Sequence, residues 1–461
     1  MHPVARKGSK WLLASAAVLA AAAVEATEPI AFAEALVRLD ANPGLAASLA
    51  RQESAEAARD GARALRYPSI EIGATYARIS DPIELDLRRL NGVLQGIDPG
   101  LPAIPNPVLQ PDTFGVASAR LTWPVFTGGR ITAANRAAEA GLAAAGAQGD
   151  ATRDSLLLDL VTRYHGVGVA AQALAVEDGT VDSLRSHLAH AQALEREGQI
   201  AKADRMRAEV ALAQAETSRQ QRSHALDMAR AALASLLGMN GEPDPVTRLG
   251  VPPPLKELPA LQDEALDANP VLRQLDAVVA QAGQGVRAAR AEYWPTVAII
   301  GNYEFASYHL PELNPEWGVL AMLKMPLFDG GERRSKVSSA TAKLHEAEAL
   351  RRDGEDKIRL LVRQRWLDCD DASRRVEVAA RTVALARESL RMQRLAFDEG
   401  EARSIDVVDA ENALAKARLG RLAARYDHAL AWTALMLAAG RRGEVEREFS
   451  RGSTESDGDA Y

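Results

Sequence analysis

An internal duplication constrains this chain more than any other feature of its sequence. The stretch LTWPVFTGGR at residues 121–130 recurs as LKMPLFDGGE at residues 323–332, displaced by 202 positions. In each copy, alternating residues lead into a proline, a phenylalanine and a Gly-Gly pair, and a long alanine-rich segment follows. Paired glycines allow a sharp backbone turn with positive φ. We therefore predict two joints at which a strand turns into a helix, formed by Pro124, Gly128 and Gly129 and by Pro326, Gly330 and Gly331.

Strict alternation of side chains predicts two strands in each copy. The alternating segments are residues 70–76, 117–123, 297–303 and 319–325. A period of two residues is the signature of a strand, so we expect four strands per chain. The segment between the first two strands, residues 80–113, is rich in proline and is not expected to be regular throughout.

A seven-residue repeat of apolar side chains follows each Gly-Gly pair. It comprises Leu160, Val167, Leu174, Val181 and Leu188 in the first copy, and Val362, Cys369, Val376, Val383, Leu390 and Phe397 in the second. A sustained heptad predicts a left-handed coiled coil. Each repeat is interrupted by a glycine, at Gly198 and Gly400, and a shorter helical segment follows. Each half is therefore predicted to form a long helical hairpin whose turn lies far from the strands.

The duplication also sets the expected domain organisation. Residues 1–26 carry basic residues and then an apolar run, which is typical of a secretory signal peptide. Residues 27–240 and 267–440 form the two repeats, each with a helix, a strand hairpin and a helical hairpin. The proline-rich residues 241–266 are expected to be an ordered strap between them. Residues 441–461 are charged and lack apolar periodicity, so we expect a disordered tail.

The composition excludes several classes of function. A formal charge of −7 argues against binding of nucleic acid, which requires clustered positive charge. The single cysteine, Cys369, rules out an intramolecular disulfide and is interpreted as a packing residue of the heptad. His187 and His190 stand one helical turn apart, but a solvated helix face explains them better than a metal site. No recurring set of residues indicates an enzyme or a cofactor site.

Four strands cannot cross a bilayer alone, because lipid offers no partner to the backbone groups of an open sheet edge. Two copies of the chain would supply eight strands and three copies twelve. The spacing does not decide between them, although the long helices need the room of a larger ring. The alternative is a soluble coiled-coil protein with short capping hairpins. The predicted export and the paired strands favour the membrane.

With these features together, the chain resembles the TolC-type outer-membrane factor family over about residues 30–440. The resemblance implies a mainly α-helical fold with a membrane β-barrel: a homotrimer whose twelve strands form the barrel in the outer membrane and whose twelve helices continue it as a periplasmic tunnel. It also implies a periplasmic adaptor and an inner-membrane pump as partners in efflux or secretion. The competing interpretation is a periplasmic adaptor. Adaptors usually carry one hairpin within lipoyl-like and barrel domains, which this chain lacks.

The resemblance places the functional residues at the helical turns. Gly198 and Gly400 match the turn glycine where the adaptor docks, and Ser404 follows in the second turn. Asp406 and Asp409 match aspartates that line a closed aperture, and Asp204 matches an acidic position on the other hairpin.

The residues themselves leave two interpretations of these acids open. Asp406 and Asp409 are three apart and so share a helix face. Three-fold symmetry would make them two stacked rings of carboxylates that attract cations. Acidic residues in a first turn after an N-cap such as Ser404 are, however, also favoured by the helix dipole alone.

Overall fold

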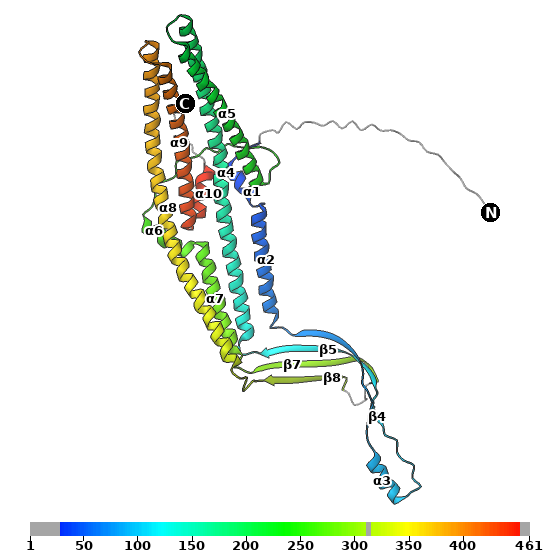
Figure 1. Ribbon diagram of the computed structural model, residues 1–461. Coiled ribbons are helices and arrows are strands. Elements are labelled where there is room, and N and C mark those ends of the chain that lie inside the picture. Colours follow the sequence, from blue (N-terminus) through cyan, green and yellow to red (C-terminus); the bar gives the residue numbers. More distant parts are fainter. Residues whose placement is uncertain (1–27, 310–314, 452–461) are drawn as a thin grey trace, which may run out of the picture.

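The computed structural model describes residues 28–309 and 315–451. Two long helical hairpins lie side by side, and a sheet lies at the end opposite to their turns (Figure 1). The first hairpin consists of α4 (Arg130–Arg196) and α5 (Lys202–Leu237), and the second of α8 (Glu332–Asp398) and α9 (Ser404–Ala438). The two predicted helical hairpins are thus confirmed.

The long helices of the two hairpins have the same length and follow the same repeat. Both α4 and α8 contain 67 residues, which corresponds to about 100 Å at 1.5 Å per residue. The heptad positions that are buried include Leu160, Val167 and Val181 on α4 and Val362, Cys369, Val383, Leu390 and Phe397 on α8. The heptad therefore marks the seam between the two helices of each hairpin. No helix in the described ranges is both long enough and apolar enough to span a membrane.

Four strands form one antiparallel sheet in the order β2-β5-β7-β8. Their bounds are Ser69–Arg78 for β2, Thr113–Phe126 for β5, Thr296–Tyr308 for β7 and Trp317–Lys324 for β8. The four predicted strands are all present. The central pair joins the two repeats, since β5 belongs to the first and β7 to the second. Apolar side chains of the edge strands are exposed, among them Ile72 on β2 and Leu323 on β8.

The proline-rich segment of the first repeat folds into a short ordered unit beyond the sheet (Figure 1). It contains β3 (Ile83–Glu84), α3 (Arg88–Ile97) and β4 (Val108–Gln110). The side chain of Asn91 holds the returning chain by accepting from the Ile104 amide and donating to the Ile104 carbonyl, both at 2.8 Å. As predicted, the segment is not regular throughout.

Both strand-to-helix joints have the same left-handed backbone. The φ angles are 62° at Gly128, 92° at Gly129, 63° at Gly330 and 91° at Gly331. Thr127 Oγ1 accepts from the Ile131 amide at 3.3 Å, and the Asp329 carboxylate accepts from the Gly331 amide at 3.0 Å. The Asp329 carboxylate also accepts from the Arg333 amide at 3.3 Å, so two different side chains satisfy equivalent free amides in the first turns of α4 and α8. Pro124 lies within β5, and Pro326 lies just after β8.

The shorter helices repeat as well: α1 (Phe32–Leu39), α2 (Pro43–Ala64), α6 (Leu258–Ala268) and α7 (Pro270–Ala291). The Asn42 side chain caps α2 and donates to the Leu236 carbonyl at 3.0 Å. In the second repeat Asn269 caps α7 and donates to the Ala438 carbonyl at 2.9 Å. Each asparagine therefore ties the short helix to the end of the returning helix of its own hairpin.

The proline-rich strap follows the surface of the helices. Its first part, β6 (Pro243–Pro245), pairs in parallel with β1 (Glu28–Ile30). Farther on, the Thr247 amide donates to the Tyr164 hydroxyl at 3.0 Å, and the indole of Trp366 donates to the Lys256 carbonyl at 2.9 Å. The last part of the strap is already helical, because α6 begins at Leu258.

The chain end differs from the expectation. We expected residues 441–461 to be disordered, but residues Arg442–Arg451 form a helix, α10. Val445 and Phe449 lie four residues apart and are buried against the core around Phe32 and Trp432. Two apolar residues are too few to form a recognisable periodic pattern, yet they anchor this helix. The remaining residues 452–461 and the predicted signal peptide, residues 1–26, lie outside the described residues.

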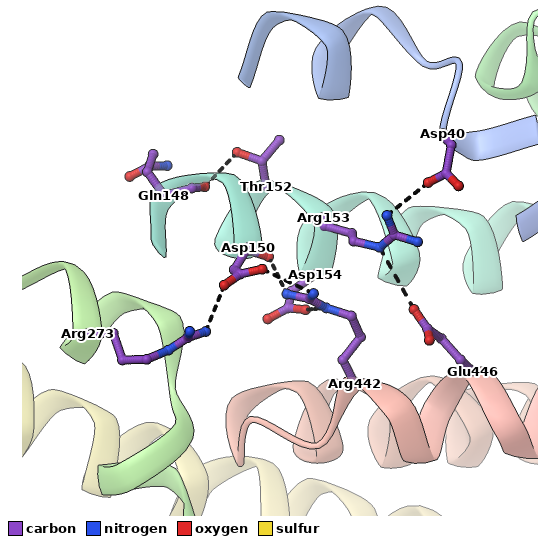
Figure 2. A network of polar contacts seen from close by, with 9 residues as sticks. All are labelled: Asp40, Gln148, Asp150, Thr152, Arg153, Asp154, Arg273, Arg442 and Glu446. Carbon is purple, nitrogen blue, oxygen red and sulfur yellow. Dashed lines mark hydrogen bonds and ion pairs between the residues drawn. The ribbon is translucent and has the colours of Figure 1, made fainter. Parts of the chain in front are cut away.

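A network of ion pairs fixes α10 to the long helix α4 (Figure 2). Arg442 contacts Asp154 and lies 3.2 Å from Asp150, which in turn lies 2.9 Å from Arg273 on α7. Arg153 contacts Asp40, the residue after α1, at 2.8 Å. These pairs join α10, α7 and the end of α1 to one stretch of α4 and thereby connect the two repeats.

Candidate functional site

The two hairpin turns lie at the same end of the molecule (Figure 1). Each turn is closed by a glycine with positive φ, 75° at Gly198 and 78° at Gly400. The Gln199 amide donates back to the Leu194 carbonyl, and the Glu401 amide donates to the Ala396 carbonyl. This is the Schellman type of helix end. A side chain added to either glycine would meet nothing within 4 Å, so the backbone conformation alone requires glycine.

Asp204 and Asp406 occupy equivalent positions in the first turns of α5 and α9. Asp406 accepts from the Arg403 amide at 2.9 Å, and this backbone hydrogen bond is the main cause that lowers the pKa of its carboxyl. Asp204 lies 3.2 Å from Arg207. Asp409 is exposed one turn farther along α9, so the structure brings Asp406 and Asp409 together and places Asp204 on the other hairpin.

The expected role of Ser404 as an N-cap is wrong. The N-cap of α9 is Arg403, and its amide donates to the Asp406 carboxylate at 2.9 Å. Ser404 is the first helical residue and is only 1% exposed. Its hydroxyl lies 2.8 Å from Nε2 of His187 on α4. The side chain is thus used for contact with the first hairpin.

His187 is not on a solvated face, contrary to the expectation from the sequence. The residue is 9% exposed, and the centroid of its ring lies 4.9 Å from that of Phe397 on α8. Burial lowers the pKa of His187. His190, one turn on, is partly exposed and lies 3.5 Å from Asp398. Within residues 28–309 and 315–451, no group of His, Cys, Asp or Glu residues could hold a metal ion.

A second polar contact joins the hairpins one turn farther from the tip. The Ser183 hydroxyl on α4 donates to the Glu411 carboxylate on α9 at 2.5 Å. Arg394 on α8 contacts both of these side chains. The Glu411 side chain is 5% exposed, so these two side chains provide the hydrogen-bond partners that water cannot. Sequence reasoning missed Ser183, Arg394 and Glu411.

A second seam on α4 could have revealed these contacts. Ala173, Thr180 and His187 recur every seven residues beside the predicted heptad, and all three are buried. Toward the tip, α4 therefore packs against two helices, α5 within its own hairpin and α9 of the other. An open groove of 670 Å³ follows this seam, lined by residues that include Glu177, Arg222, Asn412 and Lys416.

Each repeat contributes one coiled-coil hairpin and two strands of the four-stranded antiparallel sheet. This is the architecture of a subunit of an outer-membrane channel with a helical tunnel. The sequence profile described as outer membrane efflux protein matches residues 37–239 and 261–441, and the chain belongs to this family. The predicted resemblance is confirmed. The family is one of outer-membrane channel components, so the protein lies in the outer membrane with its helices in the periplasm, and it is not a periplasmic adaptor.

Known proteins show the same likeness. The chain is 31% identical to CyaE of Bordetella pertussis over 249 residues, which cover 51% of each chain. It is 25% identical to the outer membrane protein OprJ of Pseudomonas aeruginosa over 383 residues, covering 81% of this chain and 76% of OprJ. The crystal structure of VceC from Vibrio cholerae superimposes with a TM-score of 0.72 at 17% identity, covering 89% of this chain and 96% of VceC. The match to CyaE thus spans about half of that relative.

Proposed function

We propose that three copies of this chain form a passive outer-membrane exit duct of a tripartite efflux or secretion system. The observation that carries the proposal is that equivalent strands of the two repeats have different numbers of paired neighbours. In the first repeat β5 is paired on both sides, whereas among the described strands its counterpart β8 pairs only with β7. An open edge cannot remain unpaired in lipid. A further copy of the chain would supply the missing neighbour.

The duplication predicts how that neighbour pairs. Leu121 on β5 lies opposite Gly301 on β7. Up to the first strand the repeat has an offset of 227 residues, since Asn42-Pro43 recurs as Asn269-Pro270, whereas after the loop the offset is 202. Moving Leu121 forward by 202 residues and Gly301 back by 227 places Leu323 on β8 opposite Ala74 on β2 of the next copy. In the same way, α7 packs against both α4 and α8, and α2 of the next copy would complete the packing around α8.

Disulfide trapping tests this assembly. In a Cys369→Ala background, Leu323→Cys with Ala74→Cys is expected to give a covalent trimer on oxidation in outer-membrane fractions. Leu323→Cys with Arg78→Cys, displaced along the same strand, is the matched control and should crosslink far less. Covalent species that stop at the dimer would favour an eight-strand ring. Recovery of the protein in the soluble periplasm would contradict the proposal as a whole.

The acidic residues of the tip form the aperture in this proposal. Three copies would set Asp406 and Asp409 as two rings of carboxylates, with Asp204 contributing from the first hairpin. Such rings attract cations, and the lowered pKa of Asp406 supports a charged state. Asp406→Ala with Asp409→Ala should weaken block of the single-channel current by multivalent cations. Asp371→Ala, an exposed acid far along α8, is the control, and unchanged block in the double variant would exclude the aperture role.

The turns at Gly198 and Gly400, with Ser404 beside the second, are the proposed docking site for a periplasmic adaptor, which connects the duct to an inner-membrane pump. The exposed neighbours Gln199 and Glu401 would face that partner. Gln199→Trp with Glu401→Trp should reduce capture of the trimer by the purified adaptor without changing trimer yield. The duct itself carries out no chemical reaction and uses no cofactor in this account.

A further inference from the structure

The contact between His187 and Ser404 joins the two repeats, and the equivalent residues are not of the types that could form it. Shifted by 202 positions, His187 corresponds to Ser389 and Ser404 to Lys202, both of them exposed. His187 comes from α4 and Ser404 from the first turn of α9, so the contact joins the two hairpins close to the tip. A titratable side chain is therefore placed between two elements that must separate if the second hairpin moves away from the first.

The surroundings of His187 favour its neutral form. The ring packs against Phe397 of α8 and is shielded from water. The charged or titratable groups that act on it are Glu411 on α9, Arg394 on α8 and His190 on its own helix. Burial is the largest cause and lowers the pKa of His187, as His190 and Arg394 do. Glu411 and a backbone hydrogen bond of Ser404 raise the pKa, although the Glu411 carboxylate is engaged by Arg394 and Ser183. The net direction is toward the neutral ring.

We propose that the contact between His187 and Ser404 is a proton-sensitive tie that holds α9 against α4 at the tip and releases when the pH falls. Ser404 stands two residues before Asp406, so a release moves the start of the helix that carries the proposed aperture acids. The tie itself is independent of the proposed function. Only the step from movement at the tip to opening of the duct rests on that proposal.

The direction of the effect follows from proton linkage. In the tied state the pKa of His187 is lowered, whereas in the released state the ring meets water and regains the ordinary pKa of about 6.5. Protons therefore bind the released state preferentially as the pH falls through that value. Because one proton is taken up per tie, the ratio of released to tied chains rises by up to about tenfold per pH unit.

Distance measurements between the two turns test the tie. Spin labels at Gln199→Cys and Glu401→Cys, exposed equivalent positions, are introduced into the full-length Cys369→Ala protein. On going from about pH 7.5 to about pH 5.5, on either side of the ordinary histidine pKa, a second and longer distance should appear. The variant His187→Gln keeps a hydrogen-bonding side chain but does not titrate, and the longer distance should then be absent at both values.

His190→Gln is the matched control, because it removes a histidine one turn away that is partly exposed. It should respond to pH as the parent protein does. An unchanged pH response in His187→Gln, or loss of the response in His190→Gln alone, would overturn the tie. Single-channel conductance recorded at the same pH values separates the two proposals. If the distance depends on pH but the conductance stays constant, the tie is supported and the movement at the tip does not open the duct.

Discussion

The two helical hairpins have the same length and the same turn backbone but different interiors at the tip. In the first hairpin, Arg205 on α5 lies 2.7 Å from Glu195 on α4. At the equivalent positions of the second hairpin, Val407 and Phe397 are buried in one apolar cluster. An ion pair at the partly exposed surface contributes little stability, whereas burial of a phenylalanine contributes several-fold more.

The second hairpin also depends on the first. Its helix α9 is held to α4 by His187 and by the cluster of Ser183, Arg394 and Glu411. The two copies of the duplicated hairpin have therefore diverged at the tip: the first is closed by an ion pair, and the second by an apolar cluster and by polar contacts with the first.

The largest expected difference comes from the apolar contact at the second tip. Phe397→Ala removes a buried ring and should destabilise the turn by about 3 kcal/mol, whereas Glu195→Ala should cost less than about 1 kcal/mol. Trypsin reports both, since the exposed Arg403 lies in the second turn and Arg196 and Lys202 lie at the first. Cleavage requires local opening, so the rate at Arg403 should rise about a hundredfold in Phe397→Ala, because 1.4 kcal/mol corresponds to a factor of ten.

The comparison between the tips predicts a smaller change for Glu195→Ala. Cleavage at Arg196 and Lys202 should rise less than about fivefold, as expected for loss of a surface ion pair. Equal increases in the two variants would show that the tips are energetically alike and would contradict the assignment of the apolar contact to the second hairpin.

An intermediate effect is expected at the cluster that joins the hairpins. Arg394→Ala leaves the buried Glu411 carboxylate with Ser183 as its remaining contact and should destabilise the position of α9 by about 1 to 2 kcal/mol, because Arg394 is itself half exposed. The equivalent residue Gln192 is exposed on α4, and Gln192→Ala should be neutral. The measurement is the distance between labels at the two turns, which should lengthen only in Arg394→Ala.

The smallest difference is expected at the turn glycines. Gly198→Ala and Gly400→Ala should each cost about 1 to 2 kcal/mol, since an L-residue is strained at positive φ while the added carbon meets nothing within 4 Å. Thermal inactivation of the trimer should therefore shift equally in both variants. A much larger shift for Gly400→Ala would mean that this turn is packed against another surface.

Much of the fold could be predicted because most of its elements leave a regular repeat in the sequence. Alternation marked the strands, the heptad marked the seam within each hairpin, and the duplication fixed the order of the elements. Periodicity could not predict α10, which is anchored by two apolar residues, Val445 and Phe449, and by the ion pairs of Arg442. A helix with so few apolar residues leaves almost no pattern.

The candidate site was predicted only in part for a related reason. The positions of Gly198, Gly400 and Asp406 at the turns follow from the repeat, because glycine and a first-turn acid are local requirements of helix ends. His187 and Ser404 meet across 217 residues, and one heptad per helix cannot reveal a helix with two partners. The roles of the aspartates and of the docking turns remain predictions.

Single-channel recording tests whether the contacts of the second hairpin keep the proposed trimeric duct narrow at its tip. Purified protein in planar bilayers is compared with Arg394→Ala plus Phe397→Ala and with the matched pair Gln192→Ala plus Glu195→Ala. We expect a larger conductance in the first double variant and a parental conductance in the second. Equal conductance in all three proteins, or a larger conductance in the second pair, would contradict it.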